Sequence, residues 1–352
     1  MSTSRLEERS VSSSADLSAA IAAAVAAQGF ADCAATVIGS GPMGRHYVDA
    51  LRTLGVRRIR VCSRSAEQLA AFHGIEGMTT VSGGIERLAC HAQPEELAIV
   101  ATPIAVLVPA AERLAQLGFR RLLIEKPASL WSEEIRRLAT ALEAKGIEGV
   151  CAYNRVAYPS FHEAAACAAR DGSITSCAYT FTEMIKPHWP TKFPAEELAR
   201  WGIANSLHVM SLAHGLIGWP ASFEGHRTGS IAWHPTGAVF VGSGLSERGI
   251  PFAYHADWGS TGRWSVEIHT PVASYRLCPL EQVFRRTSAT GEWTELPVTT
   301  FAPQEKPGFV EQVAAMLSPQ IRALVPVMSL AVTAALTRYG EAIFGYEPIR
   351  RR

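Results

Sequence analysis

The chain has 352 residues, of which 48% are hydrophobic and 18% are charged. Its 33 lysines and arginines nearly balance its 32 acidic residues. This balance excludes a uniformly basic protein that binds nucleic acid or an acidic membrane, although a local basic patch is compatible with it. The length is enough for two domains with full hydrophobic cores.

Residues 1–30 form an extension ahead of the first predicted strand. The first fifteen residues are rich in serine and charge, which predicts disorder. The following stretch, 17–30, predicts a helix with Ser14 or Asp16 as its N-cap. A signal peptide is the alternative, but acidic residues precede the stretch and alanine is weakly hydrophobic. No segment has the length and hydrophobicity of a membrane span. The apolar stripe of the helix is Leu17, Ile21 and Val25.

Residues 31–153 alternate short apolar runs with helical patterns. This alternation predicts a parallel sheet that helices cover on both faces, with right-handed crossovers, as in a Rossmann dinucleotide-binding domain. The predicted strands are 35–38, 58–62, 79–81, 97–101, 121–124 and 149–152, and the predicted helices are 42–53, 66–72, 108–117 and 132–144.

Residues 154–352 follow a different pattern, because strand-like runs dominate from about residue 174 to residue 296. The pattern predicts an α+β domain with a mostly antiparallel sheet, and the resemblance named below implies that this domain binds substrate and forms an oligomer interface. An exposed sheet face needs a cover, so we expect a homo-oligomer. The predicted helices are 161–170 with Ser160 as N-cap, 196–217, 308–317 and 329–344, and the predicted strands are 176–183, 238–245, 252–258, 264–270 and 273–278.

The cysteines are scattered, odd in number and include no CxxC pair, so we expect no disulfide framework and a reducing, cytoplasmic compartment. Histidines, cysteines and acidic residues do not cluster with metal-ligand spacing, so no metal site is expected. No GxSxG elbow occurs, and aromatic residues do not interleave with a basic run, so no nucleic-acid partner is expected. The seven cysteines are Cys33, Cys62, Cys90, Cys151, Cys167, Cys177 and Cys278.

A GxGxxG motif lies directly after the first predicted strand and opens a helix. Gly39 permits the tight turn, Gly41 lets the backbone approach a pyrophosphate, and Gly44 allows close packing of helix on strand. The helix N-terminus attracts the anion. In this strand–loop–helix context the motif, which includes Pro42 and Met43, predicts dinucleotide binding rather than a simple glycine-rich turn.

Ser63-Arg64-Ser65 follows the second predicted strand, which has no acidic residue at its end. An Asp or Glu at this place would bind the ribose hydroxyls of NAD. Arg64 can instead pair with a 2′-phosphate or stack on adenine, and the serines can add hydrogen bonds. The sequence therefore favours NADP(H), with NAD(H) and a solvated Arg64 as the alternatives.

Four further motifs complete a pattern: Ala101-Thr102-Pro103, Glu125-Lys126-Pro127, Tyr153-Asn154-Arg155, and the segment from Trp201 to His208. Together with the glycine loop, they resemble the Gfo/Idh/MocA family (glucose–fructose oxidoreductase and inositol dehydrogenase) from about Ala34 onward. The resemblance implies a Rossmann domain followed by an α+β domain with an open, mostly antiparallel sheet. One face of that sheet would cover the nicotinamide, and the other often forms an oligomer interface.

Lys126 is the implied catalytic residue. It follows a predicted parallel strand, at the sheet edge where open α/β sheets bind ligands. Its ammonium can donate to a substrate oxygen and stabilise a developing alkoxide. We expect the bond before Pro127 to be cis. The alternative is a surface ion pair between Glu125 and Lys126.

His208 is the second candidate for catalysis, because it can take the substrate hydroxyl proton. Helical spacing places Asn205 and His208 on one face. The family often has an Asp four residues before this His, where this chain has Ala204. A buried structural histidine is the alternative.

The remaining candidates belong to two groups, one that binds cofactor and one that binds substrate. Trp189 lies in a predicted loop with Lys186 and His188. An aromatic residue with cations suits a sugar ring or a phosphate, and a rigid proline-rich loop is the alternative. Ile104 and Leu107 replace a polar residue and a His that the family usually has. The implied cofactor-binding residues are Gly39, Gly41, Pro42, Met43, Gly44, Ser63, Arg64, Thr102, Pro103, Glu125, Lys126 and Asn154, and the implied substrate-binding residues are Lys126, Tyr153, Arg155, Trp189, Asn205 and His208.

The sequence thus predicts an NAD(P)(H)-dependent oxidoreductase that moves hydride between nicotinamide and a carbinol or carbonyl carbon of a sugar, sugar derivative or polyol. Imine reduction is a chemical variant. A tightly held nicotinamide used for internal redox, giving net hydrolysis or epimerisation, is a second hypothesis. A non-catalytic regulator that senses a dinucleotide is a third, and the presence of Lys126 disfavours it.

Overall fold

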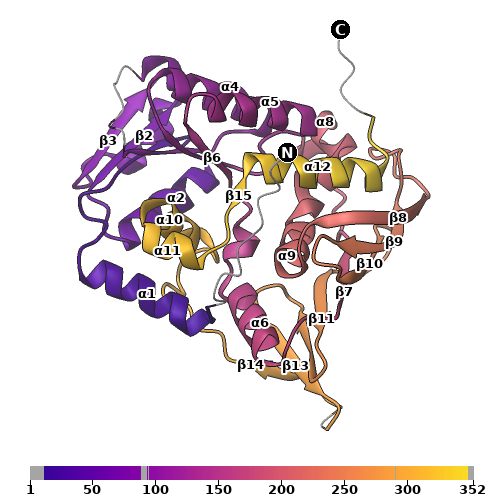
Figure 1. Cartoon of the computed structure of the whole chain (residues 1–352). Helices are drawn as coiled ribbons and strands as arrows, with labels where there is room; N and C mark the ends of the chain where they lie inside the picture. Colours follow the sequence, from indigo (N-terminus) through magenta and orange to yellow (C-terminus); the bar gives the residue numbers. More distant parts are fainter. Residues whose placement is uncertain (1–11, 89–92, 94, 290, 348–352) are drawn as a thin grey trace.

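The computed structural model describes residues 12–88, 93, 95–289 and 291–347. Two sheets lie side by side, each with its own helices, and the long helix α12 (Leu330–Phe344) runs from one towards the other (Figure 1). The predicted fold class, a Rossmann domain joined to an α+β unit with a mostly antiparallel sheet, is confirmed.

The first sheet has the strand order β15-β6-β5-β4-β1-β2-β3, and every pairing is parallel except that of β15 with β6. The central strand β4 is buried along its whole length, as expected for a strand covered on both faces. The strands are β1 (Ala34–Ile38), β2 (Arg58–Ser63), β3 (Met78–Ser82), β4 (Leu97–Val100), β5 (Arg121–Ile124), β6 (Glu148–Cys151) and β15 (Met328–Ser329).

Helices cover both faces of this sheet and create two apolar cores. One core joins α1 and α2 to α10 and α11, and the other contains α4, α5 and α12. The C-terminal segment therefore crosses back to the first sheet, where it supplies α10, α11 and β15. The helices outside α12 are α1 (Ser14–Ala26), α2 (Pro42–Thr53), α3 (Ala66–Leu69), η1 (Ala70–Phe72), η2 (Ile85–Arg87), α4 (Ile104–Gln116), α5 (Ser132–Glu143), η3 (Asn154–Ala157), α6 (Pro159–Arg170), α10 (Phe309–Leu317) and α11 (Pro319–Leu324).

The second sheet has the order β14-β13-β12-β11-β7-β10-β9-β8 and is antiparallel except between β7 and β10. Helix α9 (Leu207–Ile217) packs against β7 on the inner face. Along β10, Phe252 and Tyr254 are buried whereas Ala253 and His255 are exposed, so the outer face is open to solvent in the single chain. The strands are β7 (Ser176–Phe181), β8 (Pro220–Thr228), β9 (Val239–Ser246), β10 (Pro251–Asp257), β11 (Trp264–His269), β12 (Ala273–Leu277), β13 (Val283–Thr287) and β14 (Thr294–Leu296).

The N-terminal helix α1 forms as predicted, but its cap differs. Ser13 is the N-cap: its side chain accepts from the Asp16 backbone, and the Asp16 carboxylate accepts from the Ser13 backbone in return. Ser14 and Asp16 therefore lie inside the helix, and the reciprocal pair explains why an acid three residues after the cap is favourable. Leu17 and Ile21 are buried as predicted, while Val25 is half-buried. The predicted disorder concerns residues that lie largely outside the described chain.

Two other predicted helix starts are wrong. Helix α4 begins at Ile104, not residue 108, because the helix tolerates Pro109 in its second turn. Helix α6 begins at Pro159 after the N-cap residue Tyr158. Ser160 is not a cap, since its hydroxyl donates to the Leu280 carbonyl.

The predicted helix 196–217 is three segments rather than one. They are α8 (Ala195–Ala199), a π-helical turn η4 (Gly202–Ser206), and α9. A π-helical turn inside a helix often marks a functional site, because it redirects side chains and backbone carbonyls. Strand β8 was absent from the predicted set, since its alternation of polar and small residues gives little apolar signal.

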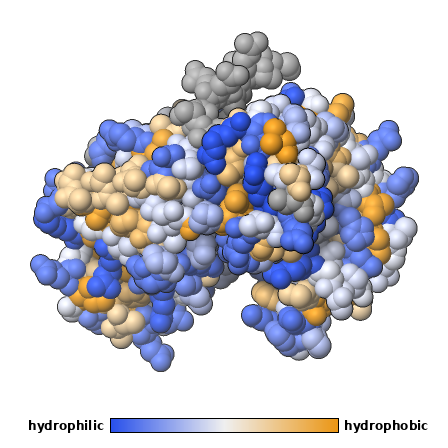
Figure 2. Space-filling model, turned by 90° about the horizontal axis from the view of Figure 1, so that it is seen from below, coloured by the Kyte–Doolittle hydropathy of each residue, from blue (hydrophilic) through white to orange (hydrophobic). Residues whose placement is uncertain are grey.

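The surface seen from below has two lobes with a notch between them, and hydrophilic and hydrophobic residues are interspersed over it (Figure 2). Within the described residues, no helix is long and apolar enough to cross a membrane. The six described cysteines form no disulfide with one another, and Cys90 lies outside the described residues.

The close packing at Gly202, the first residue of the π-helical turn, predicts that a larger residue there destabilises the fold. A Cβ atom at this position would lie 2.3 Å from the ring of Phe344, which is fully buried. We expect Gly202→Ala to lower the free energy of unfolding by about 1–3 kcal/mol, because overpacking outweighs the gain in helix propensity. Urea unfolding measures this change. Gly41→Ala is the control, since no atom lies within 4 Å of its added Cβ; equal unfolding midpoints for the two variants would contradict the prediction.

Candidate active site

The glycine loop has the shape that a pyrophosphate site needs. Gly39 has φ 113°, and a Cβ there would lie 2.2 Å from the Ala101 carbonyl oxygen. A Cβ at Gly44 would lie 2.0 Å from the Gly39 oxygen. Around Gly41, in contrast, an added Cβ meets nothing within 4 Å. The first and third glycines therefore serve packing, while the second leaves open space beside the start of α2, which fits a dinucleotide.

The end of β2 adjoins this loop through hydroxyl groups. Ser40 Oγ lies 2.7 Å from Ser63 Oγ and donates to Gln68 Oε1 at 2.8 Å. Arg64 is exposed beside the pair, and Arg45, which the sequence reasoning missed, donates to the Ser40 carbonyl. Two arginines and two hydroxyls at the tip of β2 suit a phosphate ester on the adenosine ribose.

At the end of β4, Thr102 has a buried hydroxyl without a hydrogen-bond partner among the described residues. A buried hydroxyl without a partner is costly, so a ligand that supplies the partner fits here. Pro103 precedes α4 as its N-cap residue. The positions of Thr102 and Pro103 agree with a dinucleotide that lies across the carboxyl ends of the strands.

Glu125 and Lys126 follow β5, and the Lys126–Pro127 bond is cis as predicted. The two side chains are not a surface ion pair, because Glu125 is buried and accepts from the Tyr47 hydroxyl at 2.6 Å. Burial raises the pKa of Glu125 and lowers the pKa of Lys126. Lys126 Nζ donates to the Ala204 carbonyl at 2.9 Å. This contact brings the π-helical turn to the edge of the first sheet.

His208 begins the first turn of α9 and lies beside residues that follow β6. Arg155 Nη1 is 3.2 Å from both ring nitrogens of His208, and the Tyr153 ring meets the imidazole edge-on at 5.6 Å. Burial, Arg155, Lys126 and Lys306 together hold the pKa of His208 well below its ordinary value. His208 is therefore neutral at neutral pH and has a lone pair that can accept a proton.

Asn154 does not turn its amide towards open space. Its Nδ2 donates to the Pro307 carbonyl at 2.9 Å, and its Oδ1 accepts from Arg155 at 2.9 Å. Asn154 thereby holds both Arg155 and the loop that precedes α10. The structure thus gives it contacts within the chain, and its predicted contact with a cofactor stays a prediction.

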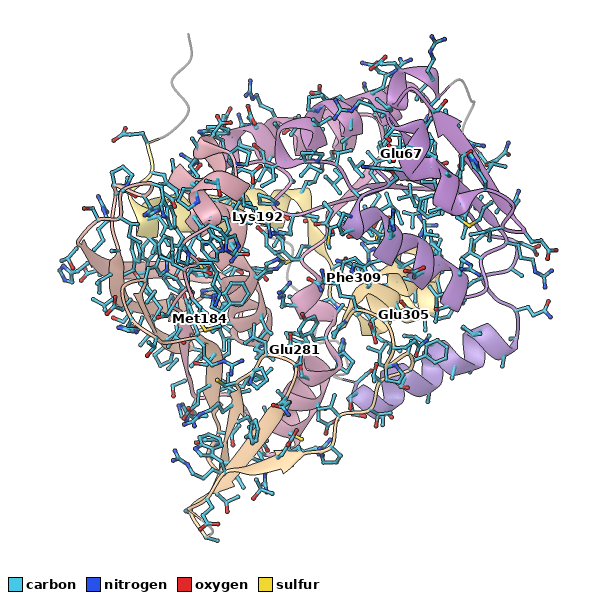
Figure 3. The ribbon with its side chains drawn as sticks, turned by 180° about the vertical axis from the view of Figure 1, so that it is seen from behind. Glu67, Met184, Lys192, Glu281, Glu305 and Phe309 are labelled. Atoms are coloured by element: carbon cyan, nitrogen blue, oxygen red, sulfur yellow. The ribbon has the colours of Figure 1, made fainter. Side chains whose placement is uncertain are left out.

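Lys306 lies in that loop and was not found by the sequence reasoning. Its Nζ contacts Met43 Sδ at 3.4 Å and lies 5.0 Å from the centre of the Phe309 ring. Burial lowers the pKa of Lys306, and the negative charge of Glu125 offsets only part of this decrease. Figure 3 marks this segment by Glu305 and Phe309, beside α2. Its position between the glycine loop and Lys126 arises only from the return of the C-terminal segment, so no local sequence signal pointed to it.

Glu183, just after β7, is a second residue that the sequence reasoning missed. The carboxylate is buried and accepts from Asn205 Nδ2 at 3.0 Å and from Ser206 Oγ at 2.6 Å. Burial raises its pKa to about 7, although these hydrogen bonds and the indoles of Trp201 and Trp264 act in the opposite direction. An acid at the end of a predicted strand is the one signal that could have identified it.

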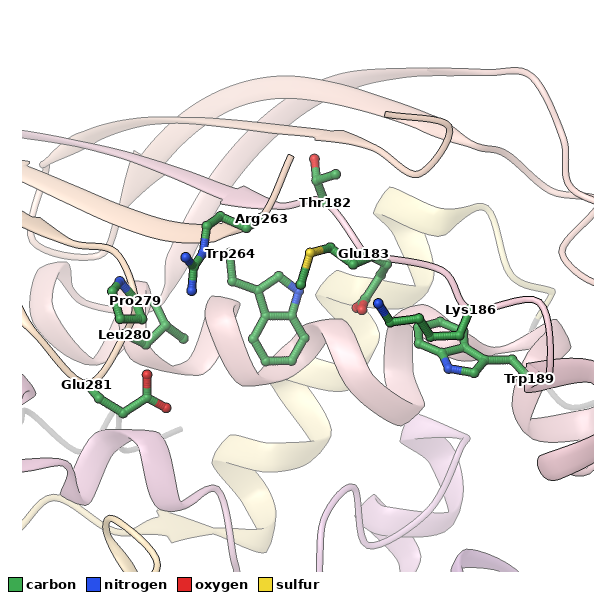
Figure 4. Close-up of a pocket in the computed structure, with 10 residues that line it drawn as sticks. Thr182, Glu183, Lys186, Trp189, Arg263, Trp264, Pro279, Leu280 and Glu281 are labelled. Atoms are coloured by element: carbon green, nitrogen blue, oxygen red, sulfur yellow. The ribbon is translucent and has the colours of Figure 1, made fainter. Parts of the chain in front are cut away.

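A pocket of about 320 Å³ opens beside this carboxylate, between the ends of β7 and β12 and the start of β11 (Figure 4). Trp264 connects it to the catalytic candidates, since its ring centre lies 6.1 Å from that of His208. Trp189 forms part of the wall and stacks on Trp201 at 4.5 Å. The lining residues are Thr182, Glu183, Met184, Lys186, Trp189, Arg263, Trp264, Pro279, Leu280 and Glu281.

The structure therefore brings Lys126, Tyr153, Arg155 and His208 together at the carboxyl edge of the first sheet. Asn205 and Trp189 lie next to this group, along the adjoining pocket. The glycine loop and Arg64 lie at other strand ends, as an extended dinucleotide requires. Within the described ranges, no group of three or more His, Cys, Asp or Glu side chains could hold a metal ion.

No protein-family model matches the chain, and no curated protein is similar to it in sequence. Solved structures do share its fold. UDP-N-acetylglucosamine 3-dehydrogenase from Acidithiobacillus ferrooxidans superposes with a TM-score of 0.66 at 14% identity, over 88% of this chain and 96% of that one.

Two other solved structures are as similar. An oxidoreductase from Agrobacterium radiobacter in complex with NAD+, L-tartaric acid and magnesium has a TM-score of 0.69 at 12% identity, over 89% of this chain and 96% of its own. Levoglucosan dehydrogenase in complex with NADH and levoglucosan has a TM-score of 0.67 at 17% identity, with the same coverage. The two-part fold implied by the resemblance to the Gfo/Idh/MocA family is thus confirmed.

The raised pKa of Glu183 predicts a pH-dependent stability. In the unfolded chain a glutamate loses its proton near about pH 4.3, whereas the buried Glu183 retains it up to about pH 7. Over that interval the native state holds the extra proton, so the contribution of Glu183 to stability falls as the pH rises.

We therefore expect Glu183→Gln to become more stable relative to the wild type, by about 3 kcal/mol, between about pH 4 and pH 8. Denaturant unfolding at the two pH values measures the difference. Glu281→Gln, at an exposed carboxylate of the same pocket, is the matched control. A constant difference between Glu183→Gln and the wild type would show that Glu183 ionises normally.

Proposed function

We propose that this protein belongs to the Gfo/Idh/MocA family and is an NAD(P)(H)-dependent oxidoreductase. It would transfer hydride between nicotinamide and a carbinol or carbonyl carbon of a sugar, sugar derivative or polyol. The observation that carries the proposal is the position of Lys126. Its amine and the neutral imidazole of His208 lie at one sheet edge, between a glycine loop that fits a pyrophosphate and a pocket of monosaccharide size.

The residues that would hold the dinucleotide come from four strand ends. Gly39, Gly41 and Gly44 would hold the pyrophosphate, Thr102 would supply its unused hydroxyl, and Lys306 would add a positive charge at the glycine loop. Bound nicotinamide would supply the hydride acceptor or donor. The arginine and serine at the end of β2 support NADP(H) over NAD(H).

Lys126 would bind the reacting oxygen. One of its three N–H groups donates to the Ala204 carbonyl, which leaves the others for a substrate. The fixed ammonium would stabilise charge that develops on the oxygen as the carbinol is oxidised. Its partial burial limits its contact with water, which strengthens this interaction.

His208 would accept the hydroxyl proton in the direction of oxidation. Its depressed pKa keeps the imidazole unprotonated, as a base must be. The imidazole does not have to be strongly basic, because Lys126 lowers the free energy of the alkoxide.

The pocket supports a sugar-like substrate. Trp189 and Trp264 offer aromatic faces, and Lys186 and Arg263 offer hydrogen-bond donors. Structures with this fold include dehydrogenases named for levoglucosan and for UDP-N-acetylglucosamine. We also infer a cytoplasmic homo-oligomer, since the outer face of the second sheet is uncovered and the described cysteines form no disulfide with one another.

Calorimetric titration of the dialysed protein with NADPH and with NADH tests the proposal. Tight, exchangeable NADPH binding would support it, and turnover of a sugar, polyol or imine panel would then identify the reacting group. Bound, non-exchanging nicotinamide would favour internal redox. Binding without turnover of any compound would favour a sensor, and no binding with no bound cofactor would refute the dinucleotide site.

Lys126→Met tests the catalytic assignment. We expect kcat to fall by about 100- to 1,000-fold, because one donor to the developing oxyanion is lost. Calorimetric affinity for the cofactor should hardly change. Lys192→Met, at an exposed lysine on α7 (Trp189–Lys192), is the control. Survival of turnover in Lys126→Met would refute the assignment.

Arg64→Ala tests the cofactor preference. The loss of a charged hydrogen bond to the 2′-phosphate should weaken NADPH binding by about 10- to 100-fold and leave NADH binding nearly unchanged. The same titrations measure both affinities. Arg52→Ala, at an exposed arginine near the end of α2, controls for net charge. Equal losses for the two cofactors would exclude a 2′-phosphate contact.

A further inference from the structure

Arg155 has an unusual environment for an arginine beside a catalytic lysine. Its guanidinium carbon lies 5.6 Å from the ring centres of both Tyr158 and Trp264, within range of cation–π attraction. Within the described part of the chain, Nη1 alone has hydrogen-bond contacts, with Asn154 and His208. Nε is buried and has no partner among the described residues. Aromatic rings thus orient a guanidinium whose other N–H groups are unused.

The other cations of the site have a nearby negative charge or a place where one would bind. Lys126 adjoins Glu125, and Glu197 also lies within electrostatic reach of it. Lys306 lies at the glycine loop, where the proposed cofactor would bring its pyrophosphate. Arg155 forms no ion pair with any described carboxylate.

The two acids that line the adjoining pocket have other partners. Glu183 accepts from Asn205 and Ser206, and Glu281 accepts from the Tyr158 hydroxyl at 3.4 Å. A half-buried cation without a counter-ion is unfavourable unless a ligand supplies one. The site is therefore one negative charge short at Arg155.

We propose that the substrate is a sugar acid or polyhydroxy acid, and that Arg155 binds its carboxylate through the fork of N–H groups that no protein residue uses. The inference deepens the proposed function and rests on it. A planar guanidinium held between rings matches a planar carboxylate with two parallel hydrogen bonds. Neutral sugars and polyols leave Arg155 without a partner and are therefore poor substrates.

The carboxylate would also act on the proposed base. Arg155 is, after burial, the largest cause of the low pKa of His208. A carboxylate bound to Arg155 offsets that positive charge and raises the basicity of the imidazole when the substrate is present. Substrate charge and proton acceptance are thereby coupled through one guanidinium.

Matched pairs of compounds test the proposal on the full chain: D-glucuronate against D-glucose, and L-tartrate against L-threitol, with D-glucose 6-phosphate as a phosphate probe. The wild type should bind and oxidise the acid of at least one pair about 10- to 100-fold better than its neutral partner. Turnover is followed with NADP+, and binding to the NADPH complex is followed by calorimetry.

Arg155→Met should remove this preference by weakening the acid alone, and Arg155→Lys should restore part of it, since charge remains but the fork is lost. NADPH affinity should stay constant in both variants. Arg286→Met is the control, because Arg286 also lies over an indole, 4.6 Å from the ring centre of Trp293, but outside the site.

Three results would overturn the proposal. Equal binding of acid and neutral partner by the wild type would show that no carboxylate is recognised. Weaker NADPH binding by Arg155→Met would assign Arg155 to the cofactor instead. A preference for the phosphate probe over both acids would replace the carboxylate by a phosphate. If no compound is oxidised, the hydride-transfer proposal fails, and the binding comparison still decides the role of Arg155.

Discussion

The hydrogen bond from Lys126 to the Ala204 carbonyl is the contact on which the site depends. It joins the carboxyl edge of the first sheet to the helix that lies on the second sheet. The Ala204 carbonyl belongs to the π-helical turn, which Tyr346 holds from the other side through the Gly202 backbone. The position of His208 therefore follows from both halves of the chain, and a catalytic pair forms only when the two halves are docked.

Charge is distributed in this site in a way that explains the protonation states. Three cations act on His208, namely Arg155, Lys126 and Lys306. The buried carboxylate of Glu125 lies next to Lys126 and accepts a hydrogen bond from the Tyr47 hydroxyl. Burial disfavours every charged form, so the carboxyl has a raised pKa and the amine a lowered one. The nearest acids on the second sheet, Glu183 and Glu281, face the neighbouring pocket. The catalytic edge is left with an excess of positive charge, which a negatively charged ligand would balance.

Much of this arrangement could be predicted from the sequence, since it depends on local patterns. Glycine spacing after a strand placed the phosphate loop, and the alternation of apolar runs gave the first sheet with its boundaries correct to within a few residues. Glu125-Lys126-Pro127 and Tyr153-Asn154-Arg155 come directly after strands, so the parallel sheet itself brings them together. The features that failed were those in which tertiary contacts override local preference. Helix α4 contains Pro109, and the predicted helix 196–217 is interrupted after Ala199 and continues as a π-helical turn from Gly202, where packing on Phe344 leaves no room for a side chain.

Three of the residues that the sequence reasoning missed share one physical reason. Glu183, Lys306 and Trp264 reach the site from the second sheet or the returning C-terminal segment, so their partners are distant in the sequence. Glu183 is informative beside Ala204, because the family that the sequence resembles often has an Asp at that position. The chain places a buried carboxylate on the neighbouring residues Asn205 and Ser206 instead. The acid is thus supplied from another element of the fold, on the pocket side of the helix. A comparison of motifs alone counts the acid as lost. In the folded chain, however, the Glu183 carboxylate contacts Asn205, the residue next to Ala204.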